Sequence, residues 1–198
     1  MARLFYLFVV IAVGAVVAHL SVIILLPVTA PATAARQLES VLSISASSPL
    51  DLSAQQRSGA IELRLDPAFR TIGCQFDVSD APFRVSGSGR VDFWSISILD
   101  PLGVSIFSAN DRIAPTTGID LTVLSRSQLR VYRQSPDPRL QNSIIVTTEE
   151  TTGFAIIRLF EPDESWRSLI DAFVGSTACG SLEEFGLAPR EEVVDPSG

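Results

Sequence analysis

The sequence predicts an all-β domain, a jelly-roll-like antiparallel sandwich, with one transmembrane helix before it and one helix packed on its sheet after it. Three observations carry this prediction. The run from Leu4 to Leu26 contains no charged residue, short alternating segments fill 61–160, and the stretch after Asp163 has helical spacing. Short strands broken by Gly, Pro, Asp and Asn are typical of sandwiches. We therefore expect a cytoplasmic stub and spanning helix at 1–26 (helix 4–26), a linker with a short helix at 27–59, an exported sandwich at 60–180 and an acidic, partly disordered tail at 181–198.

The apolar run from Leu4 to Leu26 is long enough to cross a bilayer. In lipid only a helix satisfies its own backbone hydrogen bonds, and at about 1.5 Å per residue this one reaches roughly 34 Å. Arg3 precedes the run, whereas Arg36 after it is soon followed by Glu39. The positive-inside rule then predicts a bacterial inner-membrane protein with a cytoplasmic N-terminus and a periplasmic domain. Cleavage at the A-x-A-like site that ends at Ala34 is the alternative.

One face of the predicted membrane helix carries small residues. Gly14 and Ala18 are four residues apart, and His19 lies beside them. Small residues let a second helix approach closely, and an imidazole can hydrogen-bond across such a contact. The alternative is that these residues simply belong to an ordinary spanning helix, in which Gly and Ala are common.

The elements between anchor and tail follow in order. Pro and small residues at 27–35 predict an extended linker, 34–44 a short helix, and 45–59 a loop. Apolar residues then alternate with polar ones, as in half-buried strands. We expect strands at 61–65, 72–78, 82–86, 91–99, 104–107, 120–124, 129–134, 143–148 and 154–160.

The last predicted element is a helix. Asp163 is a suitable N-cap, and Gly175 a suitable stop. Its apolar residues follow the i, i+3, i+4, i+7 spacing of a helix that packs on one face, and they are Trp166, Leu169, Ile170 and Phe173.

The stretch from Val91 to Trp166 resembles a bacterial family. Its segments VDFWSISILDPLGVSIFSANDR, LTVLSRSQLRVYRQSPDP and GFAIIRLFEPDESW are similar to the aromatic-tryptophan-serine strand, the N-D-R loop with the strand after it, and the closing strand of the domain-of-unknown-function families 1254 and 1214. The preceding DPAFRTIGCQFDVSDAPFRVSG is similar to the entry strands of short, membrane-anchored members. The resemblance implies a jelly-roll-like domain and, because such members often have tandem genes, a related small membrane-anchored subunit as partner. It implies no catalytic residues.

Composition excludes several classes of function. The net charge is -7, and all 15 basic residues are Arg, so a nucleic-acid partner is not expected. The only His is His19, inside the predicted anchor. The exported part therefore has neither His nor Lys for a Ser-His-Asp or Ser-Lys site, and we expect no metal and no cofactor.

Carboxylates are the acid-base groups that remain. Two of them can act as acid and base on a glycosidic bond, and five lie in or beside predicted strand ends, namely Asp77, Asp80, Asp92, Asp100 and Asp111. Asp is also the ordinary residue of turns, where it accepts backbone hydrogen bonds. The turn role is the favoured interpretation.

A candidate ligand site combines an aromatic residue with a polar loop. Asn110, Asp111 and Arg112 follow a predicted strand, and Trp94 lies in the strand before it, so the four residues can hold a polar ligand on an aromatic floor. Arg158 in the closing strand is a further candidate. The structural alternative is an Arg-Asp pair that closes a corner of the sheet, with Arg158 either paired or turned to solvent.

Cys74 and Cys179 are the only cysteines. In an oxidising compartment this pair favours a disulfide between a strand and the segment after the last helix. Two separate buried thiols are the alternative.

Together these observations favour a single-pass envelope protein whose exported sandwich binds a ligand or another protein. A carboxylate-based envelope enzyme that acts on saccharide is the alternative. A cleft with two converging carboxylates indicates the enzyme, and an apolar patch the interaction module. An assembly factor that depends on its own anchor is a third possibility.

Overall fold

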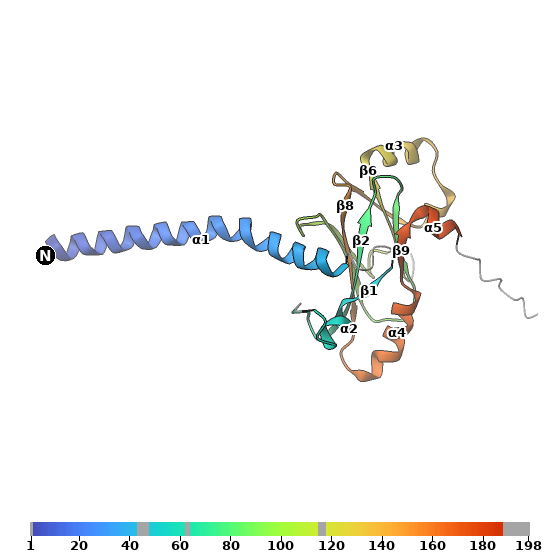
Figure 1. Ribbon diagram of the computed structural model, residues 1–198, viewed down its shortest axis with the longest axis horizontal. Helices are drawn as coiled ribbons and strands as arrows, with labels where there is room; N and C mark the ends of the chain where they lie inside the picture. The colour runs from blue at the N-terminus through green and yellow to red at the C-terminus, as the bar shows by residue number, and fades with distance from the viewer. Residues whose placement is uncertain (1, 43–47, 62–63, 115–117, 188–198) are drawn as a thin grey trace, which may run out of the picture.

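Two β-sheets and one long N-terminal helix make up the structure, a computed structural model that describes residues 2–42, 48–61, 64–114 and 118–187 (Figure 1). The strands are β1 (Leu50–Asp51), β2 (Phe69–Asp77), β3 (Phe83–Gly87), β4 (Trp94–Leu99), β5 (Ser105–Asn110), β6 (Ile119–Ser125), β7 (Ile144–Thr148), β8 (Thr152–Phe160) and β9 (Ala178–Ser181). The α-helices are α1 (Ala2–Leu42), α2 (Leu52–Arg57), α3 (Arg126–Gln134), α4 (Arg167–Ser176) and α5 (Leu182–Leu187), and the 3₁₀ turns are η2 (Pro138–Leu140) and η3 (Glu164–Trp166).

The strands form two sheets. Sheet A has the order β1-β2-β8-β4-β5, and sheet B has the order β7-β6-β3-β9. The described pairs are antiparallel except β6 with β7, which is parallel. Parallel neighbours need a crossover connection, and α3 with η2 supplies it here. The two-sheet arrangement agrees with the prediction, whereas the jelly-roll topology is not established and the fold is mixed α/β overall.

The predicted strand at 129–134 is wrong, because these residues belong to α3. Ser125 and Gln128 form a capping box, in which the Ser125 hydroxyl accepts from the Gln128 N–H and the Gln128 side chain accepts from the Ser125 N–H. This reciprocal cap satisfies two donors at the start of a helix. The local cap therefore outweighs the strand-like alternation of Leu129, Arg130 and Val131.

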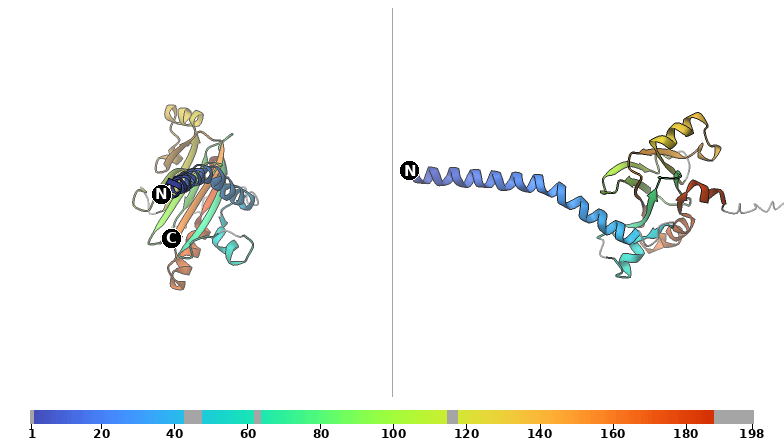
Figure 2. Two further views of the ribbon diagram at one scale, coloured as in Figure 1. Left: turned by 90° about the vertical axis from the view of Figure 1, so that its left-hand side faces the viewer. Right: turned by 45° about the horizontal axis from the view of Figure 1, so that its top comes forward.

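The N-terminal helix is longer than predicted. α1 continues through 27–35, where the sequence predicts an extended linker, and includes most of the expected helix at 34–44. Ala-rich sequence favours a helix, and each of Pro27 and Pro31 removes only one backbone donor. α1 curves on its way to the domain (Figure 2), as expected where proline interrupts a helix.

The folded domain begins before residue 60, where the sequence predicts a loop. Asp51 in β1 caps α2 by accepting from the Ala54 N–H at 2.8 Å. Ile61, Arg64 and Leu65 lie outside any strand, so the predicted strand at 61–65 is wrong for these residues, and 62–63 lie outside the described residues.

Apolar burial explains this earlier start. Leu42 at the end of α1 and Leu52 in α2 are buried with Phe154 on the outer face of sheet A. Gly73 leaves them room, because a Cβ there would lie 2.8 Å from Leu42 Cδ2. α1 is thereby fixed to the outer face of sheet A.

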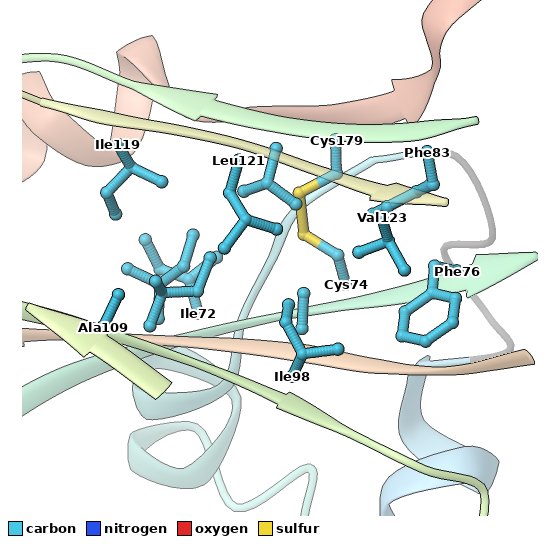
Figure 3. Packing of buried hydrophobic residues seen from close by; sticks show 14 of the residues in the cluster. Ile72, Cys74, Phe76, Phe83, Ile98, Ala109, Ile119, Leu121, Val123 and Cys179 are labelled. Atoms are coloured by element: carbon cyan, nitrogen blue, oxygen red, sulfur yellow. A yellow bond between two sulfur atoms is a disulfide. The ribbon is translucent and has the colours of Figure 1, made fainter. Parts of the chain in front are cut away.

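The main core lies between the two sheets (Figure 3). Alternate residues of β2, β4 and β8 meet those of β3 and β6, as the period of a strand requires. Cys74 in β2 and Cys179 in β9 form a disulfide across this core, which confirms the predicted bridge. The bridge links a strand of sheet A to the last strand of sheet B.

The C-terminal helix packs on the sandwich as expected. The Asp163 carboxylate accepts from the Ser165 N–H at 2.8 Å, and η3 leads into α4. Ile170 and Phe173 are buried in the main core. α4 ends at Ser176, one residue beyond the predicted stop, and the tail from 188 onward lies outside the described residues.

Three aspartates that accept local hydrogen bonds make stability depend on pH. Hydrogen bonds from the side chain and backbone of Ser79, Arg139 and Ser165 lower the pKa values of Asp77, Asp137 and Asp163 respectively. Since each folded-state pKa lies below the unfolded value of about 3.9, the stabilisation is complete above that pH and is lost as pH falls through the folded-state pKa.

Acid sensitivity is therefore expected below about pH 4. Urea unfolding at pH 7 and pH 3 measures it, and a variant with Asn at all three positions should lose less stability between the two pH values than the unmodified protein. An equal loss in both proteins contradicts the assignment to these three aspartates. Each contribution is small, because exposed groups are screened by solvent.

Candidate functional site

A cavity of about 620 Å³ opens at one end of the sandwich. Four parts of the chain meet there, namely the connection from β3 to β4, the start of β4, the residue after β5, and η3 with α4. Its lining residues are Gly89, Arg90, Val91, Asp92, Trp94, Asp111, Trp166 and Leu169. Arginine and aspartate side chains therefore line the same cavity as two tryptophans.

The strand register brings Trp94 and Asp111 together. β4 and β5 pair antiparallel with Ser95 opposite Asn110, and the Asp111 N–H donates to the Trp94 carbonyl at 3.2 Å. The two residues are therefore direct cross-strand neighbours, although the sequence separates them by the whole β4–β5 hairpin. Two of the predicted site residues are therefore neighbours in the structure, although the Trp94 side chain is only 2% exposed.

Asp111 holds a carboxylate oxygen without a hydrogen-bond partner. Within the described residues, its Oδ1 is the one buried side-chain oxygen or nitrogen for which the structure shows no partner. A buried polar group without a partner costs roughly 1–3 kcal/mol, and more if it is charged. Because Asp111 also lines the cavity, a ligand with a hydrogen-bond donor can satisfy this oxygen.

Apolar side chains form the remaining wall of the cavity. Trp94 is buried in the main core, Trp166 packs against that core while partly exposed, and Leu169 is an exposed apolar residue of α4. Ligand sites commonly combine such apolar surface with a few placed polar groups. Arg90 and Asp92, both exposed, supply opposite charges at the same cavity.

The other predicted site residues lie elsewhere. The Asn110 side chain accepts from the Arg112 N–H at 3.2 Å, so it orders the turn after β5, and Arg112 is exposed. Arg158 lies over the Phe69 ring at 4.4 Å and 3.6 Å from an Asp66 oxygen. None of these three residues lines the cavity.

Of the five candidate carboxylates, some lie in turns and others line a cavity. Asp77 and Asp100 accept backbone hydrogen bonds in their own turns, the role expected of Asp at such places. Asp80 lines a different cavity, between α3 and the connection from β2 to β3. Asp92 and Asp111 line the cavity described above, so two carboxylates share one space. Among the described residues, no group of three His, Cys, Asp or Glu side chains is placed to hold a metal ion.

Sequence reasoning missed Arg90 and Trp166 as site residues. Trp166 is noticeable in the sequence only as an apolar position of the last helix, and Arg90 as a turn residue. Their place in the site depends on how η3 and the β3–β4 connection pack together, which no local pattern indicates.

The candidate helix-contact residues lie in α1. Gly14, Ala18 and His19 are exposed, and a Cβ added at Gly14 would meet nothing within 4 Å. The stretch Ala2–Leu25 of α1 is long and apolar enough to cross a membrane, and a signal sequence near the N-terminus has the same features. Together with the disulfide, this apolar helix indicates an exported or envelope protein.

Comparison with known proteins shows similarity at the level of fold. No family model and no curated protein sequence matches the chain. A crystal structure of the VPA0106 protein from Vibrio parahaemolyticus is similar, with a TM-score of 0.51 and 14% identity over 61% of this chain. A crystal structure of an uncharacterised protein from Burkholderia cenocepacia matches at a TM-score of 0.40 and 15% identity over 59% of this chain.

Both solved proteins are much longer than the region they share with this chain. The match covers 29% of the Vibrio chain and 31% of the Burkholderia chain. Over 61% of its length, this chain therefore shares its fold with one part of the longer Vibrio protein.

Proposed function

We propose that this chain is a short, membrane-anchored member of the 1254/1214 type, and that its exported sandwich binds a small polar ligand in the cavity of Trp94, Asp111 and Trp166. The observation that carries the proposal is the unpartnered Oδ1 of Asp111 at the cavity. A buried polar group without a partner requires an explanation, and a bound molecule that donates a hydrogen bond to it is the one proposed here.

Anchoring in the inner membrane is part of the proposal. The apolar stretch Ala2–Leu25 stays as the anchor, with the N-terminus in the cytoplasm and the domain in the periplasm. Support comes from Arg3 before the stretch and from the disulfide of the domain. A reporter fused after Gly198 should be active only in the periplasm, and carbonate washing should leave the full-length chain in the membrane. A cytoplasmic reporter, or a chain that starts after Ala34, contradicts the anchor.

The second candidate function is a carboxylate-based enzyme that acts on saccharide. Support comes from Asp92 and Asp111, which line the same cavity, because an acid and a base on a glycosidic bond must share one site. Envelope saccharide incubated with the protein distinguishes the two functions. A binding module leaves the saccharide intact, whereas an enzyme cleaves it and loses this activity in either Asp92→Asn or Asp111→Asn.

A related small membrane-anchored subunit is the proposed partner. Support comes from the family resemblance and from the length of the Vibrio protein, of which the match covers only 29%. Crosslinking in the native membrane, followed by mass spectrometry, should recover a protein with the same F-W-S and N-D-R patterns. Recovery of unrelated proteins alone contradicts this partner.

Removal of Asp111 should stabilise the protein while it abolishes binding. In Asp111→Ala we expect the free energy of unfolding of the ligand-free protein to rise by about 1 kcal/mol, because an unsatisfied buried oxygen is lost. Asp163→Ala is the control, since loss of its hydrogen bond from the Ser165 N–H should lower stability slightly rather than raise it. Urea unfolding of both variants measures the difference, and a destabilised Asp111→Ala protein means that Asp111 is a structural residue.

A further inference from the structure

We propose that the ligand of the cavity is an organic cation, an ammonium or guanidinium group on an apolar body, which the Asp111 carboxylate binds. This step rests on the proposed function of the cavity as a ligand site and names the class of ligand. Asp111 supplies the anionic group, and Trp166 with Leu169 supplies apolar surface.

Asp111 differs from the other half-buried carboxylates among the described residues. Each of those has a partner that carries N–H donors. Arginine side chains or backbone N–H groups reach them, and they are Asp51, Asp100, Asp120, Asp137 and Glu161. The Oδ1 of Asp111 has no partner, and none of the described ion pairs includes Asp111. The Asp111 carboxylate therefore lacks a donor that the described residues do not supply.

The paired carboxylates indicate which kind of donor suits this one. Asp120 accepts two hydrogen bonds from the Arg84 guanidinium, at 3.0 Å and 2.7 Å. A carboxylate only accepts hydrogen bonds, and those from a cationic N–H group are about twice as strong as those between neutral groups. A neutral hydroxyl donor satisfies the oxygen but leaves the charge of Asp111 uncompensated. A cationic N–H group satisfies both.

The charges at the cavity also favour a cation. Asp92, Asp111 and Arg90 line it, so its lining carries two negative charges and one positive charge. Arg90 is exposed, and none of the described ion pairs includes it. It therefore does not compensate either carboxylate. A site with a net negative charge attracts a cation and disfavours an anion.

The rest of the lining selects an apolar body for this cation. Val91, Trp166 and Leu169 are its accessible apolar residues, whereas the Trp94 side chain is only 2% exposed. An aromatic ring attracts a cation within about 6 Å of its centre, so Trp166 can contact the charged end as well as the body. The cavity of about 620 Å³ has the size of a site for a small organic molecule.

Three probes of one shape test the charge of the ligand. Cyclohexylmethylammonium is the cation, cyclohexylmethanol the neutral match and cyclohexylacetate the anion. Trp94 and Trp166 are the only tryptophans of the chain and both line the cavity, so intrinsic fluorescence reports binding. The full-length chain is titrated in nanodiscs of zwitterionic lipid, which does not concentrate cations. The ammonium probe should bind about tenfold more tightly than the alcohol, and the anion should bind least.

Two variants test the residues that set this preference. Asp111→Asn keeps the shape and one acceptor oxygen but loses the charge, so the ammonium and the alcohol should bind with about equal affinity. Unchanged binding of the alcohol shows that the variant is folded. Arg90→Gln removes a like charge and should tighten ammonium binding about threefold. Asp80→Asn, an exposed carboxylate of the other cavity, is the control and should keep the preference of the unmodified protein.

The cation and the ligand site itself fail in different ways. Alcohol binding as tight as ammonium binding overturns the cation but keeps the site, provided that Asp111→Ala weakens both. The absence of any saturable response to the ammonium probe also overturns the cation. An equal preference for ammonium in the unmodified protein and in Asp111→Asn overturns Asp111 as the group that binds it. Native mass spectrometry of the protein from its own membrane tests the site without any of these probes.

Discussion

Loss of the disulfide should be the most damaging single change to the domain. With both cysteines replaced, in Cys74→Ala with Cys179→Ala, we expect the free energy of unfolding to fall by about 4 kcal/mol. The bridge closes a loop with a sequence separation of 105, and closing a long loop strongly restricts the unfolded chain. It also joins β2 of sheet A to β9 of sheet B, so sheet packing and the C-terminal segment depend on it.

Urea unfolding of the oxidised protein, the reduced protein and the double variant measures this effect. The reduced protein and the double variant should agree, since both lack the same constraint. A loss below about 1 kcal/mol means that the bridge forms without stabilising the domain.

Arg70→Ala should lower the free energy of unfolding by about 3 kcal/mol. The Arg70 guanidinium is 2.5 Å from Asp51, 3.2 Å from Asp171 and 3.7 Å from Glu161, and its side chain is only 11% exposed. Removal of the cation leaves Asp51 and Glu161 half-buried with less compensation for their charge. The same residue ties β1, the end of β8 and α4 to β2, so its loss affects the start and the end of the domain together.

Arg126→Ala is the matched control for Arg70→Ala. Arg126 also pairs with a carboxylate, Glu149, but the two side chains are 68% and 73% exposed. Exposed ion pairs contribute only about 0–1 kcal/mol, so this variant should unfold close to the unmodified protein. Equal losses in the two arginine variants contradict the role of burial.

The sequence was most informative where a pattern is local or chemically strict. Alternation located most strands of the two sheets, since period 2 follows directly from strand geometry. The two cysteines pointed to a bridge because an exported domain with a single pair rarely leaves both thiols free. Trp94 and Asp111 emerged together because a short hairpin brings the ends of its two strands side by side.

It was least informative where two local preferences compete. Leu129, Arg130 and Val131 alternate as in a strand, but the cap made by Ser125 and Gln128 favours α3. Two prolines at 27 and 31 suggest a linker, but the Ala-rich context and the burial of Leu42 carry α1 to the sheet. In both cases the secondary structure depends on a contact with other residues, which the periodicity of the sequence does not show.

The candidate site shows the same limit at the level of tertiary structure. Asp92 and Trp166 are far apart in the chain, and only the packing of η3 beside the start of β4 brings them to one cavity. Arginine is a common residue in binding sites. The alternation of side chains along β8, however, places Arg158 on the outer face of sheet A, over Phe69. The side of the sheet on which a residue lies therefore distinguishes the site residues better than the residue type does.

Native mass spectrometry of the full-length protein, released from its own membrane, tests the central claim most directly. If the cavity of Trp94, Asp111 and Trp166 binds a small polar ligand, the unmodified chain should carry additional mass that Asp111→Ala lacks and that Asp163→Ala retains. An unmodified chain at its sequence mass of 21.3 kDa, or the same added mass on all three proteins, contradicts a ligand site at Asp111.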